Sequence, residues 1–390
     1  MSHNKVGDVQ RLQGDLRQAL RSYQAGLIIA RKLAAADSAN ADWQRDLAVS
    51  YERVGVVLVP QGKLARALES FRTSLQIRKR LAATDPRNAR WQRDMSVSQD
   101  RIGDVLRTQG HPGQTLMAYQ ASLEIRKRLA ASDPENRTRR RDLSVSHNKI
   151  GDLARAQGDL FSALGSYRAG LVLIKDLTMS DPTNARWRRD LSVSHDRVGD
   201  VLRAQKELGP ALNSYKAALS ERQELVALDP NNAVGRRDLS VSHNKIAAVL
   251  RAQGDFQQAL DSYRAGLVIA VRLAASDARN TRWQRDLSFT HERIGDVLID
   301  LKQVSRALLS YRAGLVIRTR LAAVDPGNAV WQRDLAWSHW GLAKHGDRPR
   351  FRWGQVVAIL KALDRKGRLA ASDRKWIPVA EKNLIRASAQ

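Results

Sequence analysis

Apolar residues recur along the chain at helical spacing, in two alternating kinds of segment. In one kind, four apolar residues at positions i, i+4, i+11 and i+15 share one face of a helix: Trp283, Leu287, Ile294 and Leu298. The second kind keeps the same period: Ala259, Leu260, Tyr263, Gly266, Leu267, Ile269 and Leu273. We call these segments the A and B helices. Because strand-like alternation and Asn-Gly hairpin turns are missing from the sequence, the pattern predicts an all-α fold.

Polar residues between the segments supply helix ends. The run Gln253-Gly254-Asp255 ends an A helix, since glycine readily takes the left-handed conformation. Runs such as Asp133-Pro134-Glu135-Asn136 end a B helix, because proline stops it and the asparagine can cap the next A helix. The chain is therefore predicted to alternate A and B helices joined by short turns.

These helix pairs repeat with a fixed period of 48 residues. Tryptophans mark five of the seven slots, with Arg139 and Gly235 in the other two: Trp43, Trp91, Trp187, Trp283 and Trp331. An aromatic residue holds the same register in every B helix: Tyr23, Phe71, Tyr119, Tyr167, Tyr215, Tyr263 and Tyr311. A period of this size predicts stacked supersecondary units.

The repeated residues resemble the tetratricopeptide repeat in order and spacing. The resemblance rests on Val6-Gly7, Gly14-Asp15, Ala19, Tyr23 and Gly26, and on Ile150-Gly151, Gly158-Asp159, Ala163, Tyr167 and Gly170. The usual unit has 34 residues, so this one is similar to long bacterial variants and, more distantly, to kinesin light-chain repeats. The resemblance implies a right-handed α-solenoid of antiparallel helix pairs, with each helix extended by about two turns.

The register predicts two regions. Residues 1–339 hold seven repeats, the first lacking the N-terminal half of its A helix, and residues 340–390 hold a degenerate repeat and capping helices. We expect a helix break at 345–349, a B-like segment at 356–369 and a final helix at 378–385. Four tryptophans crowd this end, at Trp337, Trp340, Trp353 and Trp376. Packing of the cap is the preferred interpretation, and a docking patch the alternative.

Composition excludes several classes of chemistry. The absence of cysteine excludes disulfides, Cys-zinc sites, iron–sulfur clusters and thiol nucleophiles. No 18-residue apolar run and no secretory apolar stretch occur, so we expect a cytoplasmic protein without membrane insertion. The chain starts in the middle of a repeat, which fits either a missing gene start or a missing N-terminal domain, and the resemblance implies a further signalling or effector domain in the full-length product.

Neither histidines nor Ser-His-Asp runs indicate catalysis. Six histidines share one repeat position and therefore lie about one repeat apart, too far to share a metal ion: His3, His147, His195, His243, His291 and His339. Ser194-His195-Asp196 has the composition of a catalytic triad, but consecutive helical residues diverge by about 100°. The sequence predicts a protein that is not an enzyme, with no catalytic residue, metal or cofactor.

The resemblance places the binding surface on the A helices. In that family the A helices line a concave groove, and the motif glycine assigns three groove positions in each of three repeats: Asn148, Asp152 and Arg155; Asp196, Asp200 and Arg203; and Asn244, Ala248 and Arg251. A basic residue lies beside each set, at Lys149, Arg197 and Lys245 respectively. One interpretation is a solvated face on which Arg197, Asp200 and Arg203 pair along one helix. The other is a groove that binds a peptide or protein partner, which makes the chain an interaction scaffold. The groove lacks the Lys/Asn set that captures a carboxylate.

Excess positive charge favours a second surface. The chain carries 66 basic and 40 acidic residues, a net charge of +26. Basic residues gather where each B helix turns into the next A helix, and we define this basic edge as Arg90, Arg93, Arg137, Arg139, Arg140, Arg186 and Arg188. The alternative function is therefore a sequence-tolerant binder of nucleic acid or an anionic surface. Against nucleic acid, the aromatics fall on core positions, and solubility or coding bias also explains the charge.

Overall fold

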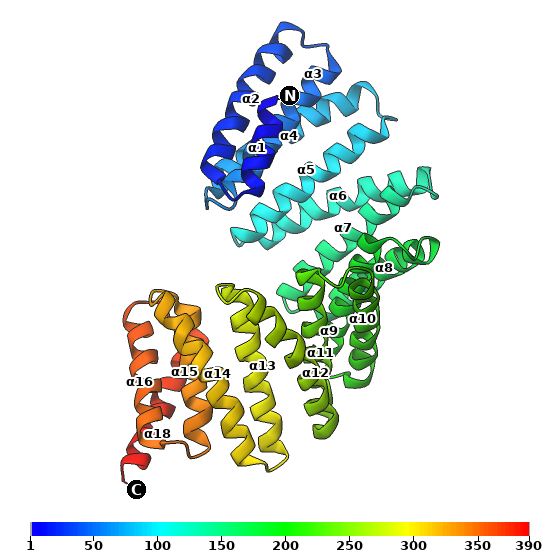
Figure 1. The fold of residues 1–390 in the computed structure, drawn as a ribbon. Coiled ribbons are helices and arrows are strands. Elements are labelled where there is room, and N and C mark those ends of the chain that lie inside the picture. The colour runs from blue at the N-terminus through cyan, green and yellow to red at the C-terminus, as the bar shows by residue number, and fades with distance from the viewer. Residues whose placement is uncertain (1, 390) are drawn as a thin grey trace. The chain divides into compact units, whose positions relative to one another are not determined.

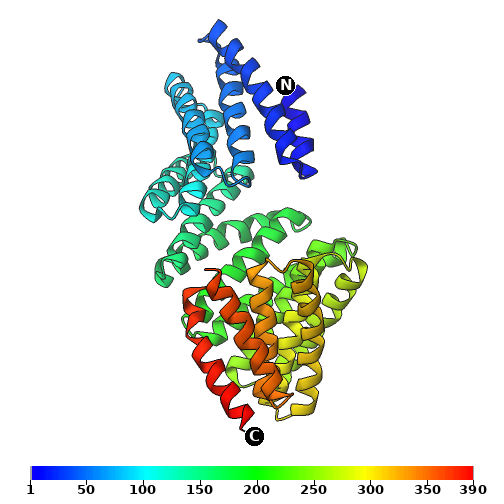
Figure 2. The ribbon, with the colours of Figure 1, turned by 90° about the vertical axis from the view of Figure 1, so that its left-hand side faces the viewer.

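The computed structural model describes residues 2–389, which form helices and connecting turns with no strand among them (Figure 1). The all-α prediction is confirmed. The chain divides into two compact units, Met1–Val201 and Leu202–Gln390, and each is described by itself. In each unit, consecutive helices pack against each other as antiparallel neighbours, the arrangement of an α-solenoid (Figure 2).

The first unit begins and ends with A helices. Its A helices are α1 (Ser2–Leu12), α3 (Ala41–Leu58), α5 (Ala89–Thr108), α7 (Arg137–Ala156) and α9 (Ala185–Ala204), of which the last three residues belong to the second unit. Its B helices are α2 (Leu16–Ala36), α4 (Leu64–Thr84), α6 (Pro112–Ser132) and α8 (Leu160–Ser180).

The second unit continues the alternation and ends in a cap. Its A helices are α11 (Ala233–Gln253), α13 (Thr281–Asp300) and α15 (Ala329–Lys344). Its B helices are α10 (Leu208–Leu228), α12 (Phe256–Ser276), α14 (Val304–Val324) and α16 (Pro349–Arg365). The short α17 (Ala371–Arg374) follows, and α18 (Trp376–Ser388) packs on α16.

Local side-chain hydrogen bonds set the helix ends as predicted. The asparagine of each Asp-x-x-Asn turn accepts a hydrogen bond from the backbone N–H three residues on, for example Asn40 Oδ1 from Trp43 at 3.1 Å. At the other end of an A helix, Gly254 has a φ of +90° and ends α11. Lys302 takes the same left-handed turn with a φ of +60°, so the turn tolerates a residue other than glycine.

The C-terminal segments extend differently from the sequence prediction. The predicted B-like segment at 356–369 is α16, which begins at Pro349 and ends at Arg365. The earlier start follows from proline, whose fixed φ suits the first position of a helix. The final helix is also longer than the predicted 378–385, because Trp376 and Ile377 already pack in the hydrophobic cluster around α16.

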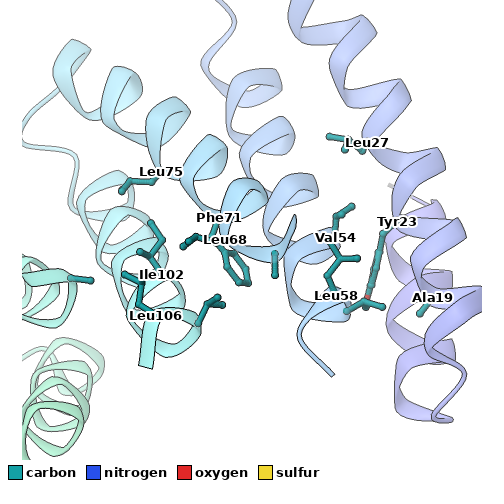
Figure 3. Close-up of a cluster of buried hydrophobic side chains, with 14 residues drawn as sticks. Ala19, Tyr23, Leu27, Val54, Leu58, Leu68, Phe71, Leu75, Ile102 and Leu106 are labelled. Carbon is teal, nitrogen blue, oxygen red and sulfur yellow. The ribbon is translucent and has the colours of Figure 1, made fainter. Parts of the chain in front are cut away.

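A close contact between a glycine of the A helix and the aromatic ring of the B helix builds the core of five repeats; the sixth repeat carries Ala247 at the glycine position. Tyr23 of α2 and Phe71 of α4 are each 1% exposed and lie between helix pairs, beside Val54 and Leu58 of α3 (Figure 3). A Cβ atom added to Gly151 would lie 2.7 Å from the ring of Tyr167. The Tyr167 ring therefore approaches this closely because the A helix carries no side chain at Gly151.

We expect Gly151→Ala to destabilise the protein by about 1–3 kcal/mol, because Tyr167 is also held by its hydroxyl on Asp152 and cannot move aside. The measurement is urea unfolding followed by circular dichroism. The control is Gly165→Ala in α8, where nothing lies within 4 Å of the added Cβ; it should be neutral or stabilising by about 0.5–1 kcal/mol. Equal unfolding midpoints for the two variants would contradict this account of the core.

Candidate functional site

A carboxylate on the A helix joins three helices in several repeats. The Tyr167 hydroxyl of α8 donates to Asp152 of α7 at 2.7 Å, and Arg197 of α9 donates to the same carboxylate at 3.1 Å. The Arg197 guanidinium also lies over the Tyr167 ring, 6.0 Å from its centroid. Burial, together with the neighbouring Asp152, raises the pKa of the Tyr167 hydroxyl, so it remains a donor at neutral pH. We call this arrangement the tyrosine–aspartate–base triad.

The triad recurs in the first unit. Tyr119 donates to Asp104 at 2.7 Å, and Lys149 of the next A helix pairs with that carboxylate at 2.5 Å. In the first repeat, Tyr23 donates to Asp8 at 2.7 Å and the base is Arg53, at 3.1 Å. Two of the predicted groove residues, Asp152 and Arg197, are thus used between repeats, and the partner of Arg197 lies on the preceding A helix.

Two repeats lack the carboxylate, and their bases turn to other partners. Val56 stands in the aspartate position of the second repeat, where the B-helix aromatic is Phe71 and has no hydroxyl to satisfy. The next base, Arg101, lies 3.6 Å from Glu52 instead. In the sixth repeat Ala248 takes the position, and Arg293 pairs with Asp296 on its own helix at 2.9 Å. Where the usual aspartate is absent, the basic side chain therefore pairs with another nearby carboxylate.

A second set of ion pairs links consecutive A helices near their N-termini. In five repeats the arginine of the repeated Arg-Asp pair donates to the aspartate 49 residues on, as in Arg45 with Asp94 at 2.8 Å and Arg141 with Asp190 at 2.7 Å. The second unit has the same link between Arg237 and Asp286 at 2.5 Å. In each unit, the A helices are thus cross-linked by charged side chains.

A buried arginine on the B helix joins the A helices on both sides of it. Arg126 of α6 is 4% exposed and lies 2.7 Å from Asp100 of α5. It also donates to Ser146 Oγ at 2.8 Å and to the Asp142 carbonyl at 3.0 Å, both on α7. Arg78 and Arg318 make the same set of contacts, with Glu52 and Glu292 as their acids.

The residue types at these two positions change together along the chain. An acid on the A helix always accompanies an arginine 26 residues on: Glu52 with Arg78, Asp100 with Arg126, Asp196 with Arg222, and Glu292 with Arg318. An asparagine accompanies an alanine or isoleucine: Asn4 with Ala30, Asn148 with Ile174, and Asn244 with Ala270. Sequence reasoning missed this covariation, although it was visible in the repeats.

Three predicted groove residues belong to this position and are largely withdrawn from solvent. Asn148 and Asp196 are each 8% exposed, and Asn244 is half-buried and donates to Thr290 Oγ1 at 2.9 Å. Arg251 is half-buried and pairs with Asp300 at 2.5 Å. Arg155 and Arg203, in the last turns of α7 and α9, are exposed and have no carboxylate partner among residues 2–389. Asp200, three residues before Arg203 on α9, is half-buried.

The basic edge is largely committed to local contacts. Arg93 pairs with Asp142, Arg140 lies 3.1 Å from Asp176, and Arg139 donates to the Leu129 carbonyl at 3.1 Å. Arg188 donates to the Pro182 carbonyl at 2.6 Å, and the Arg137 guanidinium lies 5.7 Å from the centre of the Trp187 ring. Arg90 and Arg186 are exposed, and neither pairs with a carboxylate within residues 2–389.

The histidine column packs between repeats. Burial lowers the pKa of His147, His195, His243 and His291, and burial together with Arg352 lowers that of His339 to about 4. Among residues 2–389, no three His, Asp or Glu side chains are grouped so as to hold a metal ion. Over the same residues, no helix combines the length and apolar character needed to cross a membrane.

Solved structures share this arrangement of helix pairs. The apo form of RapI matches 100% of this chain and 97% of its own, with a TM-score of 0.56 and 10% identity. The chain has the tetratricopeptide-repeat fold. BtubC (BKLC) from P. vanneervenii has the same repeat fold over 67% of this chain and 92% of its own, at a TM-score of 0.52 and 17% identity. No protein-family model and no curated protein matches the sequence.

We expect Asp100→Asn to cost about 3 kcal/mol in unfolding free energy, because Arg126 then stays buried and charged without its carboxylate. Adding Arg126→Ile reproduces the Asn148 and Ile174 pair of the next tetratricopeptide repeat and should restore most of the loss. Glu124→Gln, at an exposed ion pair of the same repeat, is the control and should change stability by less than about 0.5 kcal/mol. A double variant as unstable as the single one would refute the pairing rule.

Acidification should destabilise the array through the histidine column. Because the folded-state pKa of His339 is about 4 and the unfolded value is 6.5, the unfolded chain binds the extra proton between these values. The contribution of neutral His339 to the unfolding free energy is therefore fully present above pH 6.5 and falls as the pH drops toward 4. Between pH 7 and pH 5, His339 alone should remove about 1–2 kcal/mol. His339→Gln should flatten urea-unfolding curves measured across this range, whereas His3→Gln, at an exposed position, should leave the slope unchanged.

Proposed function

We propose that this chain is a non-enzymatic scaffold that binds an extended peptide or protein segment along the face formed by its A helices. One observation carries the proposal. The polar groups of consecutive A helices are cross-linked by the triads in the first unit and by the Arg-Asp ion pairs in both units, while Arg155 and Arg203 stay exposed. Tetratricopeptide arrays are typically interaction scaffolds, which agrees with this use.

Rigidity is what the cross-links add to binding. A side chain held by two partners has already lost its rotamer freedom, so a ligand that contacts it does not have to restrict it again. A partner would therefore meet half-exposed groups such as Asp152, Lys149 and Arg197 in one preset arrangement. An extended segment suits this surface because the set recurs at the 48-residue spacing of the repeats, at Asp8, Asp104 and Asp152.

The same contacts favour the A-helix face over the basic edge. Most arginines of the edge already bind a carboxylate, a carbonyl or an aromatic ring, so a phosphate would have to displace those partners. Arg90, Arg137 and Arg186 of the edge are exposed and have no carboxylate partner among the described residues, and of these Arg137 lies over the Trp187 ring. Three such charges give a weaker dependence of affinity on salt than the steep one typical of nucleic-acid binders.

The test combines affinity capture with two matched charge reversals. The full chain is used to capture partners from its native cell lysate with and without nuclease, and the captured molecules are identified by mass spectrometry. Arg155→Glu with Arg203→Glu should weaken capture by about tenfold or more. Arg90→Glu with Arg186→Glu makes the same change in net charge on the basic edge and should leave capture intact.

The opposite pattern would overturn the proposal. If nuclease removes the captured material, and the Arg90 and Arg186 reversals abolish capture while the other pair does not, the basic edge is the binding surface. Circular dichroism of both double variants confirms that neither change has unfolded the repeats.

A further inference from the structure

Four tryptophans at the C-terminal end form one contacting cluster. Trp340 of α15 lies at its centre, with ring centroids 4.8 Å from Trp353 of α16, 5.3 Å from Trp337 and 5.6 Å from Trp376. The planes of these pairs are inclined by 65° to 79°, so the rings meet edge to face. Trp353 is 6% exposed, but the other three remain partly open to solvent.

The open parts of these indoles line a hollow. It has a volume of about 650 Å³ and lies between α15, α16 and α18, with Pro349 and Ala387 at one side. A second hollow of about 710 Å³ shares Pro349 and Ala387 with it and adds Phe351 and Leu384. Volumes of 300–1,000 Å³ with apolar walls are typical of ligand sites. Packing of the cap accounts for the buried Trp353 but leaves this recess uncovered.

The charges around the recess are all of one sign. Lys344 and Arg386 line the first hollow, and Arg348 and Arg350 line the second, whereas no aspartate or glutamate lines either. All four bases are exposed, and none pairs with a carboxylate within the described part of the chain. The nearby Asp347 is buried and already accepts from Arg312 and Arg352. An unpaired group of cations beside an apolar recess is complementary to a ligand that joins negative charge to an apolar group.

We propose that this recess, the tryptophan pocket, binds an acidic peptide segment that inserts a large apolar or aromatic side chain. The side chain is buried against Trp337, Trp340 and Trp376, and carboxylates on either side of it pair with Lys344 and Arg386. Indoles give an inserted ring edge-to-face contacts of the kind they already make with one another. Trp340 and Lys344 hold the repeat positions of Asn148 and Asp152, so the pocket uses the A-helix positions of the degenerate repeat and adds a second kind of contact to a scaffold.

Peptide is favoured over the other anionic macromolecules by the shape of the site. A nucleic-acid strand stacks successive bases on aromatic faces that follow the strand, whereas these indoles pack edge to face against one another. An anionic membrane surface is met by an apolar face in the plane of the interface, whereas the apolar surface here is recessed behind charges. A single inserted side chain flanked by acids fits both features.

The test uses labelled peptides and the full chain. A fluorescein-labelled peptide of sequence EEDFEELDE is titrated at about 0.15 M salt and followed by anisotropy, with EEDSEESDE as the peptide that keeps the charge and loses the apolar groups. Only the first should bind. Lys344→Glu with Arg386→Glu should weaken its binding by about tenfold or more.

Two further variants separate the pocket from general charge and from misfolding. Arg365→Glu with Lys366→Glu makes the same change in charge at the other end of α16 and should leave binding unchanged. Trp337→Val introduces the residue that five other repeats carry at this position, from Val49 to Val241, so the fold should persist while affinity falls. Arg155→Glu with Arg203→Glu should not affect this peptide, which distinguishes failure of the pocket from failure of the proposed function tested at Arg155 and Arg203.

Three results would overturn the assignment. One is equal binding of the two peptides, which would mean simple attraction between opposite charges. Another is the absence of binding of EEDFEELDE at about 1 mM. The third is that poly(U) RNA or phosphatidylserine vesicles bind more tightly than the peptide and lose that binding with Lys344→Glu and Arg386→Glu, which would assign the recess to a different class of ligand.

Discussion

In the repeats that carry it, the carboxylate of the triad is the group that ties one repeat to the next. Asp152 accepts one hydrogen bond from the B helix of its own repeat and others from the A helix of the next, so one side chain sets two distances. It is accessible to both because Gly151, beside it, lets the Tyr167 ring approach the A helix. A buried hydroxyl and a half-buried guanidinium would both lose their acceptor without it, and such groups are costly to leave unpaired. At this position Gly151 thus contributes to how the two repeats meet.

Net charge alone describes the electrostatics of this chain poorly. Many of the basic side chains behind the charge of +26 hold the fold together. Arg126 serves a carboxylate, a hydroxyl and a carbonyl in the interior, and Arg139 and Arg188 bind carbonyls near the ends of B helices. Cations without a partner remain at a few places, such as Arg155 and the surroundings of the tryptophan pocket. The density of arginines along the chain and the positions of the arginines without a carboxylate partner therefore indicate different binding surfaces.

Local physics explains what was predictable from the sequence. Helix ends follow from proline, glycine and asparagine acting on their own neighbours, so the A and B helices lie where the pattern predicted them. The partner of Arg197 was not predictable, because residues three or four apart on one helix are equally plausible partners, and the choice depends on how close the next helix lies. The burial of Asn148 depends likewise on packing between repeats. The pocket beside Trp340 depends on where α18 settles on α16, which the irregular end of the chain does not encode in any repeated pattern.

The matched acid–arginine and asparagine–aliphatic pairs also restrict how an array of this kind can gain or lose repeats during evolution. Both members of a pair, such as Glu52 and Arg78, lie within one repeat, on the A helix and on the B helix that follows it. Recombination between misaligned copies of the gene keeps every pair together if the crossover falls in the loop between one repeat and the next. An exchange joined in the turn between A and B can combine an asparagine with an arginine and leave a charge buried alone. Unequal recombination is therefore tolerated at one boundary of the repeat and selected against at the other.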